Sequence, residues 1–347
     1  MSIAAIELND ASVALARDGA LLARSPGFAL LDGHTLTVGE QALRQARLNP
    51  RRISSRFWER LSNEPVMPAA SPGLTCADLA REHIARIWDA AGLGVDCLVL
   101  AVPGHFDRGQ LGMILGISEQ LALPVRGMVE SALAACGAHA GAGLVIHVAV
   151  HLHRTVVTGI HIDDEARRVF TDSVEGHGLV RLYEGWVELI GELFVRKTRF
   201  DPLHSADSEQ AIYDRLPHWL EALVSSDALR IETAARDGSI HAIELTRAQV
   251  EERALEFYQA LRARIAARSP DGDFVLELER SAANMPGLAA TVLQGTGGRA
   301  VSLPAGAGAL GALRRSRWIV QPDWRNTLTV SLPRDAFGHV ESAEPSQ

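Results

Sequence analysis

The sequence contains few cysteines. Cys76, Cys97 and Cys136 are the only three among 347 residues, and they lie far apart without a CxxC motif. An odd number of scattered cysteines argues against a disulfide framework and against a thiolate zinc site. We therefore expect a protein of the reducing cytoplasm.

Long apolar segments and an excess of basic residues are also missing. No run reaches the roughly 18 apolar residues of a membrane-spanning helix, and residues 1–10 lack the basic start of a secretion signal. The 34 Lys and Arg residues face 42 Asp and Glu residues, which gives a net charge of -8. Such a balance provides no global field for nucleic acid phosphates. We expect neither membrane insertion nor nucleic acid binding.

Short apolar segments alternate with turn signals in a pattern that occurs twice. Residues 3–8, 13–17 and 20–24 predict a β-meander, and residues 144–162 with 167–171 predict another. Each meander is followed by α/β units, because helical spacing occurs at residues 75–91, 108–121, 179–195 and 250–265, while residues 96–102 and 274–278 are compact apolar runs typical of buried strands. The sequence therefore predicts an α/β protein with a duplicated architecture.

These patterns divide the chain into three parts. Residues 1–142 form a first lobe with a small insertion at about 25–92, and residues 143–303 form a second lobe with an inserted subdomain at about 199–245. Residues 304–347 add a helix that returns to the first lobe and a C-terminal extension. In the subdomain we expect two helical stretches, 208–216 and 219–225, on either side of Pro217. Alternating Leu328, Val330 and Leu332 predict an extra edge strand, or a segment that docks a partner.

Three local strings indicate a family. Residues 38–42 read VGEQA, residues 102–106 read VPGHF with Gln110 nearby, and residues 245–252 read LTRAQVEE. They are similar to the VGxxA, VPxxF...Q and (I/L)TRxxFE segments of the nucleotide-binding domain of DnaK-type heat-shock chaperones, in the actin-like ATPase superfamily. The resemblance covers about residues 3–314 and implies a duplicated two-lobe actin-like (ribonuclease H-like) ATPase-domain fold.

The family binds ATP between the lobes with glycine-rich hairpin turns, and the first of these is altered here. Residues 7–11 read ELNDA where the family has Asp-x-Gly-Thr-Thr. Glu7 keeps a carboxylate and Asn9 tolerates a positive φ, but Asp10 brings a negative charge to the phosphate position. The first turn therefore looks hostile to ATP.

The other two turns have also lost their glycines. Residues 147–152 read HVAVHL in place of Asp-x-Gly-Gly-Gly-Thr, so His147 replaces the carboxylate and a left-handed turn at Val150 would be strained. Residues 279–283 read ERSAA in place of Gly-Gly-Ser-Thr-Arg, which leaves only Ser281. Glu221 falls where the helix that clamps adenine has a basic residue.

Elements that build the fold are retained, whereas residues that touch nucleotide are not. Glu130 and the small-residue helix around Gly311 match the family's linking helices. We therefore predict a non-catalytic pseudo-ATPase without a cofactor, which acts through protein contacts as a scaffold or regulatory subunit, with homo-oligomer formation left open. Because the chain ends soon after that helix, we expect no peptide-binding β-domain and no folding-chaperone activity.

Two other functions compete with this prediction. A divergent ATPase would use Glu7 and Glu130 with magnesium, and ATP or ADP would lie against Asn9, Asp10, His147, His151 and Ser281; otherwise Glu7, Asp10 and Glu130 form a solvated cleft rim. A small-ligand or metal-binding module would use a histidine-lined cleft. His147, His151 and His153 share one face of a continuous strand, but that strand is too long for one zinc or nickel ion unless a turn intervenes.

Overall fold

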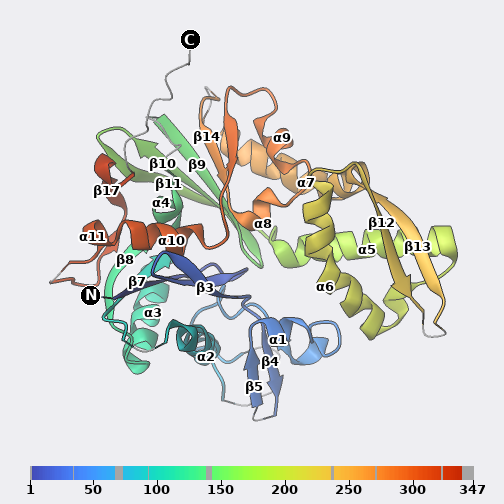
Figure 1. The fold of residues 1–347 in the computed structure, drawn as a ribbon, viewed down its shortest axis with the longest axis horizontal. Coiled ribbons are helices and arrows are strands. Elements are labelled where there is room, and N and C mark those ends of the chain that lie inside the picture. Colours follow the sequence, from blue (N-terminus) through green and yellow to red (C-terminus); the bar gives the residue numbers. More distant parts are fainter. Residues whose placement is uncertain are drawn as a thin grey trace.

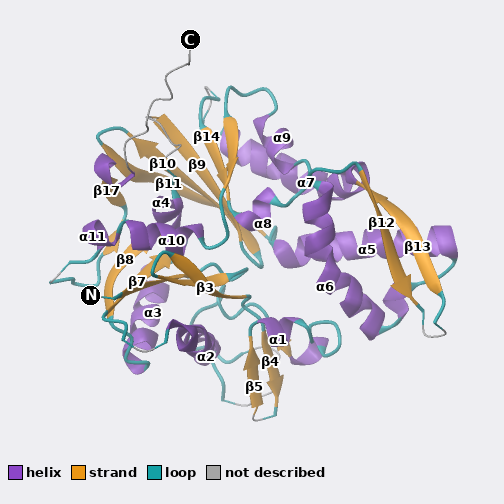
Figure 2. Ribbon diagram, in the orientation of Figure 1, coloured by secondary structure: helices purple, strands orange, loops and turns teal. Residues whose placement is uncertain are grey.

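A computed structural model describes residues 2–33, 35–66, 73–92, 94–137, 143–235, 238–269, 272–321 and 323–337. The fold is α/β, with two six-stranded mixed sheets and helices around and between them (Figures 1 and 2). The predicted class is thus confirmed. Residues 338–347 of the expected extension lie outside the described residues. Across the described ranges, no helix has the length and apolar character needed to cross a membrane.

The first sheet has the strand order β16-β8-β7-β1-β2-β3. Its strands are β1 (Ile3–Glu7), β2 (Val13–Arg17), β3 (Ala20–Ser25), β7 (Cys97–Val102), β8 (Val125–Glu130) and β16 (Leu328–Thr329). The first three form the predicted antiparallel meander, and β7 and β8 add parallel strands. α2 (Cys76–Trp88) and α3 (Arg108–Gln120) bury Leu79, Ile84 and Ile114 in the same core as β1 and β7.

The second sheet has the order β15-β14-β9-β10-β11-β17. Its strands are β9 (Gly143–Val150), β10 (Arg154–Ile162), β11 (Glu165–Glu175), β14 (Val275–Leu278), β15 (Arg299–Ser302) and β17 (Ser331–Pro333). Here again an antiparallel meander is followed by two parallel strands on the side of its first strand. α5 (Leu179–Thr198), α7 (Arg247–Ala266) and α9 (Leu288–Leu293) contribute Trp186, Leu261 and Leu288 to its core. The two sheets therefore repeat one topology.

Two short helices lie between the sheets (Figure 1). α4 (Ser131–Ala135) and α10 (Ala307–Arg314) pack on each other and on residues of both sheets in one apolar cluster. A side chain on Gly311 would collide with the carbonyl oxygen of Ala134. The close helix packing predicted for this segment is thus present, and it depends on glycine.

Each half contains an insertion. In the first half, β4 (Ala29–Asp32), β5 (Thr35–Val38), β6 (Ile53–Ser54) and α1 (Glu40–Leu43) form a small three-stranded unit. In the second half, α6 (Ala206–Leu223) packs beside the hairpin of β12 (Ala228–Ala234) and β13 (Ile240–Thr246).

One expectation for the second insertion is wrong. The predicted break at Pro217 does not occur, because Tyr213, Leu216 and Leu220 continue one buried face across it and packing outweighs the lost backbone hydrogen bond. Besides the expected helical residues, the insertion contains the β12–β13 hairpin, which was not predicted and in which Ile231 and Ile243 are paired and buried.

The C-terminal segment joins both sheets. β16 pairs in parallel with β8 of the first sheet, and β17 pairs antiparallel with β11 of the second. Only Val330 separates the two strands, and its carbonyl oxygen accepts a 2.9 Å hydrogen bond from Arg168 N. We call residues 328–333, which follow α11 (Ser316–Ile319), the C-terminal strap. The expected extra strand is therefore present and connects the two halves.

Candidate functional site

The turn between β1 and β2 is shaped by an asparagine side chain. Asn9 Oδ1 accepts a 2.9 Å hydrogen bond from Ala11 N, and Asn9 O accepts one from Ser12 N. Asn9 and Asp10 do not adopt a positive φ. An Asx-type side-chain contact thus replaces the conformational freedom that glycine would provide, and the N–H groups of Ala11 and Ser12 are bonded within the turn.

The turn between β9 and β10 spans His151 to His153. His151 N donates to Arg154 O at 2.9 Å, and β9 continues through Val150. No residue in this turn has a positive φ. The strain expected at Val150 therefore does not arise, because the turn begins one residue later.

Asp10 joins the two hairpins. Its Oδ1 accepts a 2.9 Å hydrogen bond from Leu152 N and lies 3.0 Å from His151 Nδ1. Burial opposes ionisation of Asp10, but the hydrogen bond and the charge of His151 outweigh it and lower the pKa of this carboxyl. With Asp10 only 5% exposed, the interpretation as a solvated rim is wrong for this residue. The negative charge is buried in a contact between the halves.

A second polar cluster surrounds His147. Its Nε2 lies 3.1 Å from Glu279 Oε1, and its Nδ1 lies 3.5 Å from Glu277 Oε2. Burial opposes protonation of His147, but both carboxylates outweigh it and raise its pKa to about 10. Asn9 Nδ2 donates to Glu279 Oε2 at 2.6 Å. This cluster therefore forms a second contact between the halves, around a protonated histidine.

Glu7 lies at the N-terminal end of α10. Its Oε2 accepts hydrogen bonds from Gly308 N at 3.1 Å and Ala309 N at 3.3 Å. A Cβ on Gly308 would lie 2.6 Å from Glu7 Oε1, so this approach requires glycine. Burial, and then the nearby Glu279, raise the pKa of Glu7 to about 8. Glu7 is therefore largely protonated at neutral pH, and the solvated-rim interpretation is wrong for it too.

Glu130 has a separate structural role. Its Oε2 caps α4 by accepting a 2.8 Å hydrogen bond from Leu133 N, and the residue is fully buried. Burial raises its pKa. The rim interpretation is thus wrong for this third carboxyl as well, which is committed to a helix terminus.

The three histidines proposed as metal ligands contact different groups. His147 binds the two glutamates, His151 binds Asp10, and His153 Nε2 lies 3.0 Å from both Ser55 Oγ and Ser55 O. The three side chains do not share one strand face, because a turn intervenes: His147 lies in β9, and His151 and His153 lie in the turn after it. No group of three or more His, Cys, Asp or Glu side chains that could hold a metal ion occurs among the described residues.

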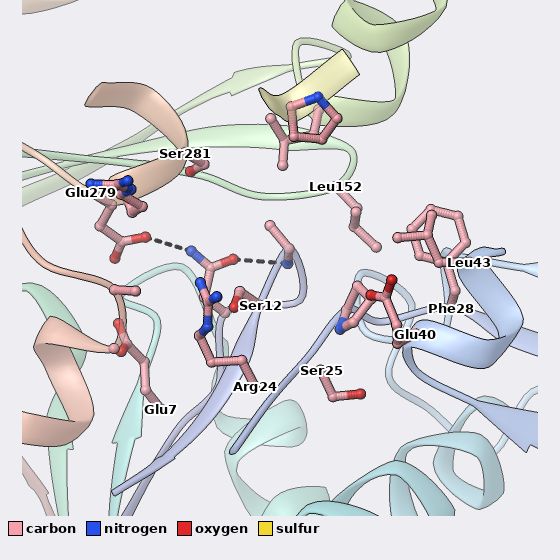
Figure 3. A pocket seen from close by; sticks show the side chains of 18 of the residues that line it. Glu7, Ser12, Arg24, Ser25, Phe28, Glu40, Leu43, Leu152, Glu279 and Ser281 are labelled. Carbon is pink, nitrogen blue, oxygen red and sulfur yellow. Dashed lines mark hydrogen bonds between the residues drawn. The ribbon is translucent and has the colours of Figure 1, made fainter. Parts of the chain in front are cut away.

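A cleft of about 360 Å³ lies between the halves beside these contacts (Figure 3). It is lined from the first half by Glu7, Asn9, Ala11, Ser12, Arg24, Ser25, Pro26, Phe28, Glu40 and Leu43, and from the rest of the chain by Leu152, Leu179, Tyr183, Tyr213, Pro217, Glu279, Arg280, Ser281 and residues 304–307. Ser281 Oγ donates to Val150 O at 3.4 Å. Glu279 and Ser281 flank the start of α8 (Arg280–Ala283), where Arg280 pairs with Glu221 of α6.

Further contacts near the cleft join the halves. Gln210 of α6 accepts a 2.7 Å hydrogen bond from Arg47 N and donates to Leu43 O at 3.2 Å. The Arg47 guanidinium lies 4.5 Å from the centre of the Tyr213 ring. The α1 segment and α6 are therefore in direct contact beside the cleft.

Five residues were expected to lie against a nucleotide: Asn9, Asp10, His147, His151 and Ser281. The structure places Asn9 and Ser281 at the cleft and the other three in the contacts behind it. Sequence reasoning missed the roles of Glu277 and Gln210. The available signal was a pair of glutamates at the end of an otherwise apolar segment, since Glu277 lies in β14 and Glu279 directly follows this strand. No protein-family model matches this chain, and no curated protein matches it, so its function is inferred from the geometry of the cleft.

Proposed function

We propose that this chain is an actin-like protein related to the DnaK-type ATPase domain, and that it acts as a non-catalytic pseudo-ATPase scaffold or regulatory subunit in the cytoplasm. The repeated strand order of the two sheets, with α4 and α10 between them, supports the fold assignment. Its partner is a protein, and self-association is one form that this contact can take.

The buried contact of Asp10 with His151 and Leu152 N carries the proposal. In the ATPase family, phosphates lie between two hairpins and hold them through backbone N–H groups. Here an aspartate from one hairpin takes the N–H and the imidazole of the other. A carboxylate at this position repels phosphate and already supplies the bridge that phosphate would make.

Two other contacts support a fixed arrangement of the halves. Arg47 and Gln210 connect them beside the cleft, and the C-terminal strap connects the two sheets through main-chain pairing. A ligand shifts a conformational equilibrium only through different affinities for its two states. We therefore propose that the halves remain together without nucleotide and present a constant surface to a partner.

The direct test is a hydrolysis assay of the purified protein with ATP and magnesium. We expect no turnover above a buffer control and no rise in melting temperature with ATP or ADP, because nucleotide that bound the native state would stabilise it. Turnover that disappears in the Glu7→Gln variant would contradict the proposal.

A divergent ATPase is the second candidate, and the size of the cleft favours it. A cleft of about 360 Å³ falls within the range of about 300–1,000 Å³ found for small-molecule sites. The carboxyls that it would require are poorly suited to magnesium, however, because Glu7 is largely protonated at neutral pH and Glu130 caps α4. Activity lost in both Glu7→Gln and Glu130→Gln would establish this candidate instead.

A further inference from the structure

The charged groups that line the cleft are not all neutralised by neighbours. Glu40 pairs with Arg44 at 3.3 Å, and Arg280 pairs with Glu221. Arg24 is exposed and has no ion-pair partner within the described ranges. It is thus the cation of the cleft that is available to a ligand.

The inner end of the cleft has the opposite character. Glu7 and Glu279 both line it, and both are at least nine-tenths buried. Burial opposes ionisation of Glu279, but the hydrogen bond and the charge of His147 outweigh it and lower the pKa of this carboxyl, so Glu279 stays a carboxylate while Glu7 is neutral. Gly308 N and Ala309 N both donate to Glu7 Oε2. This end therefore presents the Glu279 carboxylate to a donor, and a cationic group beside Glu7 would lower the raised pKa of that carboxyl and favour its carboxylate form.

Apolar side chains form another wall of the cleft. Figure 3 shows Phe28, Leu43 and Leu152 on the side away from Glu7 and Glu279, with Arg24 between the two groups. The cleft thus has three regions, which are acidic, basic and apolar. Its volume of about 360 Å³ suits a small ligand rather than a polymer.

We propose that the cleft binds a small zwitterion with an apolar side chain, of the class of the apolar α-amino acids. The ammonium group lies against Glu7 and Glu279, the carboxylate faces Arg24, and the side chain packs on Phe28, Leu43 and Leu152. This inference goes beyond the scaffold function and does not depend on it, because its evidence lies in the cleft and not in the hairpin contact. It gives the scaffold a ligand whose charge pattern differs from that of a polyphosphate.

Calorimetric titration with phenylalanine tests the proposal, with phenethylamine and 3-phenylpropanoate as analogues that each lack one charge. Glycine serves as the analogue without an apolar group. We expect phenylalanine to bind, and each of the three others to bind at least about tenfold more weakly, because each lacks one of the three contacts; a tenfold change corresponds to about 1.4 kcal/mol.

Variants then assign the charges. Arg24→Ala should abolish the preference for phenylalanine over phenethylamine, and Glu279→Gln should abolish the preference over 3-phenylpropanoate. Arg51→Ala is the matched control, because Arg51 is also exposed in the first half and does not line the cleft. Arg24 is also exposed, so its removal leaves the fold intact and keeps the test valid if Glu279→Gln fails to fold.

Two results would overturn the proposal. One is the absence of binding by phenylalanine, and also by leucine as a smaller apolar member of the class. The other is binding in which Arg24→Ala and the control Arg51→Ala leave the relative affinities equally unchanged. Because the probes contain no phosphate, failure here is distinguishable from failure of the pseudo-ATPase proposal, which is tested with nucleotide.

Discussion

The contact between Asp10 and His151 should be sensitive to the loss of either partner. The two side chains are 7% and 5% exposed, and one carboxylate oxygen holds both the imidazole and Leu152 N. Asp10→Ala leaves Leu152 N and His151 Nδ1 without their acceptor, which costs about 1–3 kcal/mol for each buried polar group. Because a folded domain is stable by only about 5–15 kcal/mol, Asp10→Ala should remove a large part of the stability.

A double-mutant cycle measures this coupling. We expect Asp10→Ala and His151→Ala each to lower the urea midpoint strongly, and the double variant to lose less than the sum by about 1–3 kcal/mol. His161 and Asp163 provide the control, since they form a pair of the same kind at 3.8 Å with side chains 41% and 50% exposed. Their cycle should show little coupling. Additive losses at Asp10 and His151, or equal coupling in both pairs, would show that the buried contact does not couple the two hairpins.

Three further predictions follow from the contacts between the halves. The pKa of Glu7 is raised from 4.5 to about 8 and that of His147 from 6.5 to about 10, so between pH 6.5 and 8 the folded state holds protons that the unfolded chain has released. Stability should therefore fall as pH rises in this window, by about 1 kcal/mol per pH unit for each proton. Chemical denaturation at several pH values should show that the free energy of unfolding of Glu7→Gln depends less on pH than that of the unchanged protein; an equal dependence would exclude Glu7 as a source. Leu332→Asp should detach the C-terminal strap, because Leu332 is buried in β17. Calorimetry should then show two unfolding transitions in place of one, whereas a single unshifted transition would show that the strap does not hold the halves together. Arg47→Ala should speed proteolysis of the α1 segment without lowering the far-UV helical signal, since it removes the stacking of the guanidinium on Tyr213 and its ion pairs with Glu184 and Glu209, each at 3.6 Å. An unchanged rate of cleavage would contradict this prediction.

Much of the fold could be predicted from the sequence, because its elements carry strong local signals. The capping boxes of α2 and α7 place the starts of these helices after Thr75 and Thr246. The period-two apolar pattern predicted the two meanders. The uninterrupted α6 could not be predicted from local rules, because its buried face, and not the backbone preference of Pro217, decides the conformation.

The candidate site was less predictable. The sequence indicated that the hairpins lack glycine and carry Asp10 and His151, but it could not indicate that these two residues contact each other across 141 positions. It placed Glu7, Asp10 and Glu130 at a solvated rim, whereas all three are buried: Glu7 and Asp10 accept hydrogen bonds from backbone N–H groups distant in the sequence, and Glu130 caps α4. Long-range pairing of this kind depends on tertiary packing, which a local pattern does not contain.

A distance measured across the cleft shows whether the halves stay in one arrangement without nucleotide. Spin labels on Gln41→Cys in α1 and on Ser225→Cys after α6 would report this distance, because both positions are exposed while Cys76, Cys97 and Cys136 are buried. We predict one narrow distance distribution that millimolar ATP and magnesium leave unchanged. A broad or two-peaked distribution, or a shift on adding ATP, would contradict the account.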